Sequence, residues 1–529
     1  MYKIDTKIDK PDIDYMKDKV TQLMNRGIRL GNFEEIQNYY SNLRNSLYSD
    51  ISNKYEIDNP NSPQQVASYI KSISNRVPLD QKNDILEICY DNRSNKWTTS
   101  KDALEKLSDL GYQFASDLLD YRRAKKLAES IESLAKYKDD DNLVHPDVEL
   151  GKTHRINYRN PGLLTIPKKL LWHLIVPYTN GNVLYSVDIK NQEPNILINM
   201  TGADDIKYAL ESPDGLYECL FKECFKPITH ANILIDTLME DRVYSIDELE
   251  AIGTVSPAKF MPIRPEVNET YYQNKKVIGI EIICAGSSKG KTVDLPNEIV
   301  IETEDGETHA VNVKWDTTKI DKCKNRSSDY TVDGIIDGLD IRISKVARKE
   351  FKTAWNAISY GATIFGVNMQ CKTIDGNKVY NYITKIDALK NYRSLVGEHA
   401  KKGNQIIKTL FGTPMYAGGE FDPKRLKRIL LDLPIQGTGA DILSLLIKHF
   451  YDYIGQNGLS DKLDICYTRH DELIIEVNGK WLSEVGNETV TNTLRDILEH
   501  QINDWTPFKV EIEQTKAEDL NIDYIYEDE

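Results

Sequence analysis

Residues 185–193 read Tyr-Ser-Val-Asp-Ile-Lys-Asn-Gln-Glu, and this stretch decides how the rest of the chain is interpreted. Residues 183–188 predict a buried strand that runs into a polar turn. Asp188 then stands at the end of a strand, and Glu193 follows five residues later. Two more acids, Asp471 and Glu472, lie between two further predicted strands, at the expected tip of a β-hairpin.

Carboxylates at strand ends, supplied by two distant segments, are suited to holding a pair of Mg²⁺ ions. Such ions activate an attacking hydroxyl and neutralise a leaving pyrophosphate. Taken one at a time, aspartates at strand ends are more often ordinary turn formers. The acids alone therefore leave both interpretations open.

A predicted helix over residues 348–361 carries a second polar group. Arg348, Lys352, Asn356 and Tyr360 recur every four residues and share one helix face. Two cations, an amide and an aromatic ring are too polar for a core stripe, and they fit a triphosphate with a base or sugar beside it. A solvated face is the alternative, and it accounts for the cations better than for the tyrosine.

The composition first argues against a nucleic-acid partner, because the 529 residues carry a net charge of −15. Residues 342–428, however, hold 17 lysines and arginines against 6 acids, a local surplus of +11 that can focus a polyanion. Charge alone favours a solvated lysine-rich surface. The seven scattered cysteines predict a reducing, cytoplasmic location, and we expect no signal peptide and no membrane partner.

The chain changes character along its length. Residues 1–150 read as mostly helical, and β-branched runs at 277–283 and 298–303 predict a small β-rich insertion. We expect helices to resume from 341 to 410. Residues 285–292 nearly spell a phosphate-binding loop, but no helix is predicted after them, so a basic hairpin loop is the better interpretation.

Read together, these residues resemble family A DNA polymerases, the bacterial DNA polymerase I-like group. The stretch 185–193 is similar to the first palm motif of that family, the spacing of Arg348, Lys352 and Tyr360-Gly361 to its fingers motif, and His470-Asp471-Glu472 to its last palm motif. Weaker matches occur in the same order, including Thr409-Leu410-Phe411-Gly412 and the helix from Arg428 to Ile442.

The resemblance implies an α+β right-hand fold of thumb, palm and fingers, with an antiparallel palm sheet and a β-rich insertion. It assigns the N-terminal helical region and thumb to 1–150, the palm to 151–226 and 426–529, the insertion to 227–325 and the fingers to 326–425. The thumb-like segment begins near the N-terminus. We therefore expect a compact phage- or plasmid-type polymerase without exonuclease domains, hence without intrinsic 3′–5′ proofreading.

The resemblance also implies roles for individual residues. The two Mg²⁺ ions, for which Mn²⁺ can substitute, would be held by Asp188, the backbone carbonyl of Ile189, and Asp471. The catalytic residues would be Asp188, Asp471, Glu472 and Lys352, the last as a proton donor to pyrophosphate. The dNTP would contact Ile189, Gln192, Glu193, Arg348, Lys352, Asn356 and Tyr360, with Glu193 excluding a 2′-hydroxyl. The primer–template duplex would contact Arg155, Arg428, Gln436 and His470.

The expected function is template-directed extension of a primer 3′ end with dNTPs, in replication or repair. The insertion at 227–325 is expected to dock a processivity or other replication protein or to add a DNA contact, and an inert elaboration is an equal alternative. A single-subunit RNA polymerase shares the palm chemistry, but Glu193 argues against it. An inactive DNA-binding scaffold is the third possibility. Several positions depart from the family: Asn356 replaces an aromatic residue, Gly162 and Leu164 replace two polar palm-entry residues, and a family histidine has no clear match near 214–217.

Overall fold

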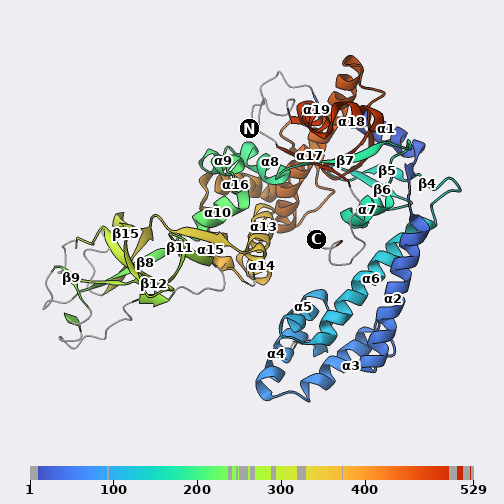
Figure 1. Ribbon diagram of the computed structural model, residues 1–529. Coiled ribbons are helices and arrows are strands. Elements are labelled where there is room, and N and C mark those ends of the chain that lie inside the picture. The colour runs from blue at the N-terminus through green and yellow to red at the C-terminus, as the bar shows by residue number, and fades with distance from the viewer. Residues whose placement is uncertain are drawn as a thin grey trace.

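The computed structural model describes residues 10–91, 95–235, 241–245, 248–249, 260–262, 268–287, 294–318, 329–371, 373–499, 509–515 and 525. Within these residues the chain is an α+β fold, as predicted, with helices packed around a four-stranded antiparallel sheet. Figure 1 shows two parts that project from this body, an arm of N-terminal helices and a β-rich insertion.

The first of the N-terminal helices packs against the body, and the helices that follow it form a long arm. Helix α1 (Ile13–Arg26) contacts α17 and β20 of the body. In the arm, the two 23-residue helices α2 and α6 lie side by side, and shorter helices with a core of their own cover the tip (Figure 1). The arm consists of α2 (Phe33–Tyr55), α3 (Pro63–Ser74), α4 (Leu79–Cys89), β2 (Tyr90–Asp91), β3 (Lys96–Trp97), α5 (Lys101–Asp109) and α6 (Gln113–Ala135).

The four-stranded sheet has the order β20-β21-β7-β22, with every neighbouring pair antiparallel. Its strands are β7 (Val183–Ile189), β20 (Leu463–Arg469), β21 (Glu472–Val477) and β22 (Val510–Gln514). All six residues of β21 are buried, because helices pack against the sheet. This sheet therefore fixes the ends of β7 and β21, where the predicted acids lie.

Short elements connect the arm to the sheet and surround it. Before β7 lie β1 (Ile28–Arg29), β4 (Leu143–Val144), β5 (Asp147–Leu150), β6 (Ile156–Arg159), the 3₁₀ turn η1 (Leu163–Thr165) and α7 (Lys168–Leu174). After β7 come α8 (Gln192–Thr201), α9 (Asp204–Glu211) and α10 (Leu216–Cys224), and after β21 come α18 (Gly479–Val485) and α19 (Asn487–Glu499).

Helix α17 (Pro423–Gln456) is the central helix of the body. It is long and apolar enough to cross a membrane, but 78% of its most apolar window is buried inside the protein. It contacts α1, α8, α16 and α19, as a core helix does. Its apolar residues therefore serve the interior of the fold.

The predicted helical stretch 341–410 holds four helices, α13 (Lys345–Ser359), α14 (Ile364–Gln370), α15 (Gly376–Lys385) and α16 (Asp387–Lys401). Its two ends are strands, so the prediction was wrong there. Strand β17 (Asp340–Ile343) pairs with β11 of the insertion, and β18 (Ile406–Lys408) pairs with β19 (Pro414–Tyr416). At the first end a strand partner distant in the sequence overrides the local helical period, and at the second end a short hairpin with β19 does so.

The β-rich insertion projects between α10 and α13 (Figure 1). Its sheet has the order β17-β11-β12-β14-β15-β16-β8-β13-β9, with β10 paired to β12, and it encloses a separate hydrophobic core. Besides β17, its strands are β8 (Ile228–Leu234), β9 (Val243–Tyr244), β10 (Phe260–Pro262), β11 (Asn268–Tyr272), β12 (Lys275–Glu281), β13 (Ile283–Gly286), β14 (Glu298–Thr303), β15 (Thr308–Trp315) and β16 (Tyr330–Ile336). Residues 288–292 of the phosphate-loop-like stretch lie outside the described residues.

Candidate active site

The structure brings the acids of the two predicted motifs together at one edge of the sheet. In the register between β7 and β21, Asp188 and Glu472 are directly opposite each other. Asp471 lies in the tight turn between β20 and β21, next to His470, which has a left-handed φ of 55°. The carboxylates of Asp188, Asp471 and Glu472 therefore converge from segments that are far apart in the sequence.

The charges of this carboxylate group are incompletely balanced. Burial, followed by repulsion from Asp188, raises the pKa of Asp471 to about 7. Burial also raises the pKa of Glu472, although Lys168 and a hydrogen bond donated by the Ser186 hydroxyl oppose the shift. The Lys168 ammonium lies 2.9 Å from Oε1 of Glu472 and 3.6 Å from Oδ2 of Asp188.

The donor set fits a divalent cation of the magnesium type. Mg²⁺ is commonly bound by one or two carboxylates, with substrate phosphates and water completing its shell. Asp188 and Asp471 supply two such carboxylates, and their mutual repulsion is relieved by a cation between them. Among the described residues, no group of three or more acidic, histidine or cysteine side chains is placed to hold one metal ion, so the remaining ligands would come from the substrate or the backbone.

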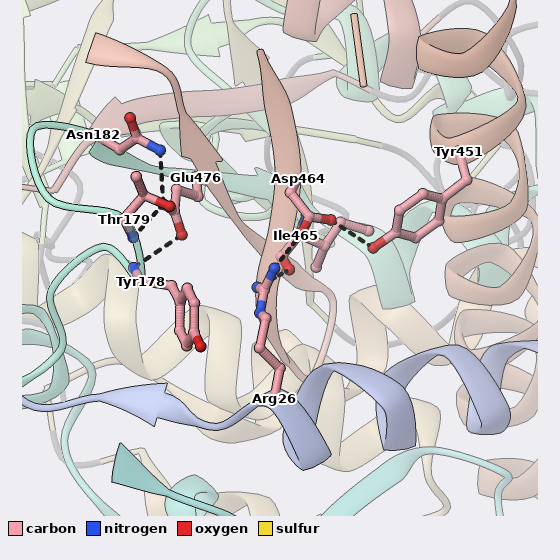
Figure 2. A network of polar contacts seen from close by, with 8 residues as sticks. All are labelled: Arg26, Tyr178, Thr179, Asn182, Tyr451, Asp464, Ile465 and Glu476. Atoms are coloured by element: carbon pink, nitrogen blue, oxygen red, sulfur yellow. Dashed lines mark hydrogen bonds and ion pairs between the residues drawn. The ribbon is translucent and has the colours of Figure 1, made fainter. Parts of the chain in front are cut away.

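A polar network anchors the opposite end of the hairpin that carries Asp471 (Figure 2). Arg26 of α1 forms an ion pair with Asp464 and donates to the carbonyl of Ile465 at 3.2 Å. The Tyr451 hydroxyl donates to Asp464 at 2.9 Å. Glu476 accepts three hydrogen bonds from the loop before β7, from the backbone nitrogens of Tyr178 and Thr179 and the amide of Asn182. Helices α1 and α17 and this loop thus hold both hairpin strands.

A second polar group, which we call the Glu193 cluster, consists of Arg155, Glu193 and Tyr360. The guanidinium of Arg155, in the turn between β5 and β6, lies 2.7 Å from Oε1 of Glu193 at the start of α8. The hydroxyl of Tyr360, at the end of α13, donates to Oε2 of the same carboxylate. Burial and the charge of Glu193 raise the pKa of Tyr360, so its hydroxyl stays protonated. Three separate segments therefore fix the position of Glu193.

Gln192 is almost completely buried beside this cluster, at 3% exposure. Its Oε1 would lie 2.7 Å from a Cβ at position 439, and the guanidinium of Arg155 would lie 3.8 Å from it. The absence of a side chain at Gly439 of α17 therefore leaves room for the buried amide of Gln192. The amide nitrogen of Gln192 has no hydrogen-bond partner in the described structure.

The predicted face of α13 points toward solvent, as a ligand-binding face requires. Arg348 and Lys352 are exposed, whereas Asn356 and Tyr360 are half-buried. The ammonium of Lys352 lies 5.8 Å from the ring centre of Tyr217 on α10. Burial raises the pKa of Tyr217, the charge of Glu193 adds to this shift, and the charge of Arg348 opposes it. Tyr217 therefore lies between Glu193 and the polar face of α13.

Of the four predicted duplex contacts, Arg428 and Gln436 lie on α17, His470 lies at the hairpin tip, and Arg155 belongs to the Glu193 cluster. Arg428 of α17 is exposed and packs close to Gly361, whose φ is +88°. Gln436, two turns later on α17, is half-buried and opposes the burial that raises the pKa of Asp432. His470 is exposed at the hairpin tip, and its pKa is lowered by partial burial, then by Arg469 and Arg155. These positions are open to a duplex, and the contacts themselves stay a prediction.

Three residues of the site were missed in the sequence. Lys168 pairs with two of the acids, Tyr217 lies under Lys352, and Asp432 faces the Glu193 cluster with its pKa raised to about 6 by burial and by Glu193. Tyr217 lies close to the place where a family histidine is expected, so the lack of that histidine at 214–217 could have pointed to Tyr217. Lys168 and Asp432 carried no local signal.

Comparisons with known proteins agree with this arrangement. The family model for DNA polymerase family A matches residues 32–232 and 335–518. The model for the bacterial Ig-like domain (group 4) matches residues 274–339, inside the insertion. Among solved structures, the chain is similar to the POL domain of Pol1 from M. smegmatis, in a complex with DNA primer-template and dNTP. That match has a TM-score of 0.59 and 15% sequence identity, and it covers 95% of this chain and 69% of the other.

Proposed function

The chain belongs to DNA polymerase family A and is a DNA-directed DNA polymerase, and we propose that it extends a primer 3′ end by nucleotidyl transfer assisted by two divalent cations at Asp188 and Asp471. One observation carries the proposal. The two aspartates meet at the sheet edge, where Asp188 and burial raise the pKa of Asp471 to about 7. Such a pair is suited to a cation that a nucleotide brings with it.

In the proposed reaction, the primer 3′-oxygen attacks the α-phosphorus of the dNTP in line, a new O–P bond forms and pyrophosphate leaves. Bound cations would supply Lewis-acid activation of the 3′-hydroxyl and neutralise the phosphates. Arg348 and Lys352 would bind the triphosphate from the exposed face of α13, and Lys352 would protonate the departing pyrophosphate oxygen. Glu193, held by Arg155 and Tyr360, would exclude the 2′-hydroxyl of an NTP.

The remaining predicted residues are proposed to support these contacts. Asn356 and Gln192 would border the nucleotide, the carbonyl of Ile189 would add a cation ligand, and Glu472 would lie near the primer terminus. The partners would be primer–template DNA and dNTPs, and the cofactor Mg²⁺, with Mn²⁺ as a substitute. Arg155, Arg428, Gln436 and His470 would contact the duplex.

Primer extension by the purified protein tests the catalytic assignment. Asp471→Asn keeps the shape of the side chain and removes its charge, so we expect the extension rate in Mg²⁺ to fall by at least about a hundredfold. Asp214→Asn is a matched control, because Asp214 pairs with Lys222 at 2.8 Å outside the site. An undiminished rate in Asp471→Asn would refute the assignment.

We also propose that synthesis proceeds without intrinsic 3′–5′ proofreading. The two family models match a polymerase segment and an Ig-like segment of the chain, and these matches support the proposal. A primer with a mismatched, labelled 3′ nucleotide provides the test. We expect the label to remain on the primer in the presence of Mg²⁺, and its release by the purified protein as a mononucleotide would contradict the proposal.

The insertion is proposed to dock a processivity or other replication protein. Its separate hydrophobic core, its Ig-like match and its projection from the body support an independent module (Figure 1). Because β8 to β16 belong to the insertion sheet, whereas β17 also contacts α10 of the body, the deletion should remove residues 228–339 and join Pro227 to Asp340 by a short glycine–serine linker.

Product length per binding event separates three outcomes for this deletion. Docking predicts unchanged products from the purified protein but shorter products in a replication-competent extract. Shorter products from the purified protein alone would instead indicate a DNA contact by the insertion. Unchanged products in both reactions would identify an inert elaboration.

A further inference from the structure

Three acids form a row across the sheet at the active-site edge. In the strand register, Asp188 of β7 has Glu472 of β21 on one side and Glu511 of β22 on the other. Residues directly opposite each other in antiparallel strands present their side chains on the same face. Like charges in such pairs destabilise a sheet, so this row requires nearby cations.

Two lysines neutralise the row from different sides. The ammonium of Lys190 pairs with Glu511 at the exposed edge. Lys168 lies at the other side, with its ammonium 2.9 Å from Glu472 and 3.6 Å from Asp188. In the described part of the chain, the ion pair of Asp188 is the one with Lys168.

The position of Lys168 is set by its own helix. It is the first residue of α7, and Pro167 immediately before it has a φ of −52°. The ammonium also lies 5.1 Å from the ring centre of Trp172, one turn further along α7. A cation held over an aromatic face is constrained in direction as well as in charge. Lys168 is therefore fixed at the acids by contacts on two sides.

We propose that Lys168 is a built-in counter-ion of the catalytic carboxylates, which balances Asp188 before a divalent cation binds and competes with that cation for it. Glu472 is buried and stays paired with Lys168, whereas Asp188 is 38% exposed at its side chain and reachable from solvent. Lys168 thus acts as a positioning residue that keeps the acids together and weakens cation binding in the absence of a nucleotide. The inference rests on the proposed function of Asp188 as a metal ligand.

Equilibrium binding of Mn²⁺ to the full chain, without DNA or dNTP, tests this inference. Free Mn²⁺ is measured by electron paramagnetic resonance in the wild type and in Lys168→Gln, which keeps an amide donor for Glu472 but removes the charge. We expect Mn²⁺ to bind about tenfold more tightly in Lys168→Gln, because one nearby positive charge is lost. Lys168→Arg retains the charge and should bind Mn²⁺ like the wild type.

Two further variants show whether the measured Mn²⁺ binds at Asp188. Lys190→Gln removes the same charge from the same sheet edge, but its ammonium pairs with Glu511, so a smaller change is expected. Asp188→Asn should abolish the tightest Mn²⁺ site. If it does not, the proposed metal site is wrong. If it does, and Lys168→Gln binds no more tightly than the wild type, the counter-ion inference alone is wrong.

A measurement on the unaltered chain covers the case in which Lys168→Gln fails to fold. When Mn²⁺ occupies Asp188, the Lys168 amine loses one of its two carboxylate partners. Its acetylation by an amine-reactive reagent, followed by peptide mass spectrometry, should therefore become several-fold faster in saturating Mn²⁺, with Lys190 as internal reference. Equal rates with and without Mn²⁺ would overturn the inference.

Discussion

The carboxylate group and the Glu193 cluster lie in the same active site but balance their charges differently. Glu193 has the guanidinium of Arg155 at 2.7 Å and the hydroxyl of Tyr360 on its other oxygen. Burial and the charge of Asp188 instead disfavour the ionised form of Asp471, so its pKa rises to about 7. The charge of Glu193 is therefore balanced by residues of the protein itself, whereas the carboxylate group needs a cation to balance its charge.

The largest expected effect comes from removing charge at the incomplete group. Asp188→Asn should lower the single-turnover rate of nucleotide addition by at least about a thousandfold, because several kcal/mol of charge stabilisation in the transition state are lost. Rapid-quench measurements with bound primer–template isolate this step. Glu193→Gln should lower the same rate far less. Equal losses in the two variants would break the distinction between the two groups.

The next effect concerns sugar selection at the complete group. Glu193→Ala removes the side chain that would crowd a 2′-hydroxyl, so the preference for dNTP over NTP should fall by about a hundredfold. The measurement is the ratio of kcat/KM for a dNTP to that for the matching NTP. Tyr360→Phe leaves the carboxylate in place and serves as the control with a smaller change. A preference unaltered by Glu193→Ala would remove Glu193 from the sugar pocket.

Asp441 is a separate case of an acid whose pKa is raised by burial. Asp441 is fully buried in α17 and accepts hydrogen bonds from the hydroxyls of Thr409 and Thr413, and burial raises its pKa to about 6. The folded state then binds this proton more tightly than the unfolded chain, whose aspartates titrate near 3.9. The stability from this group is present at low pH and is lost as pH rises toward 6.

The pH dependence of unfolding measures that loss. Between pH 5 and pH 7.5, the wild type should lose about 1.4 kcal/mol relative to Asp441→Asn, because the variant has no proton to release there. Urea unfolding of both proteins at each pH gives the difference. A constant difference over this range would mean that the carboxyl of Asp441 does not titrate between pH 5 and pH 7.5 in the folded protein.

The parts that could be predicted from the sequence are those fixed by local spacing. The four-residue period placed Arg348, Lys352 and Tyr360 on one face of α13, and strand patterns placed Asp188 and Asp471 at strand ends. The contacts of Lys168 and Asp432 depend on segments brought together by the fold, so no spacing reveals them. Likewise, β17 is a strand because its partner β11 lies far away in the sequence. The five domain boundaries and the roles of the site residues stay predictions.

Single-nucleotide addition on four templates tests the central claim most directly. The purified protein, a labelled primer and Mg²⁺ are combined with templates that differ in the first unpaired base, and each dNTP is supplied alone. The account predicts rapid addition of the complementary dNTP on each template, slow addition of the other three, and loss of all four reactions in Asp471→Asn. Addition that ignores the template base, or that survives in Asp471→Asn, would contradict it.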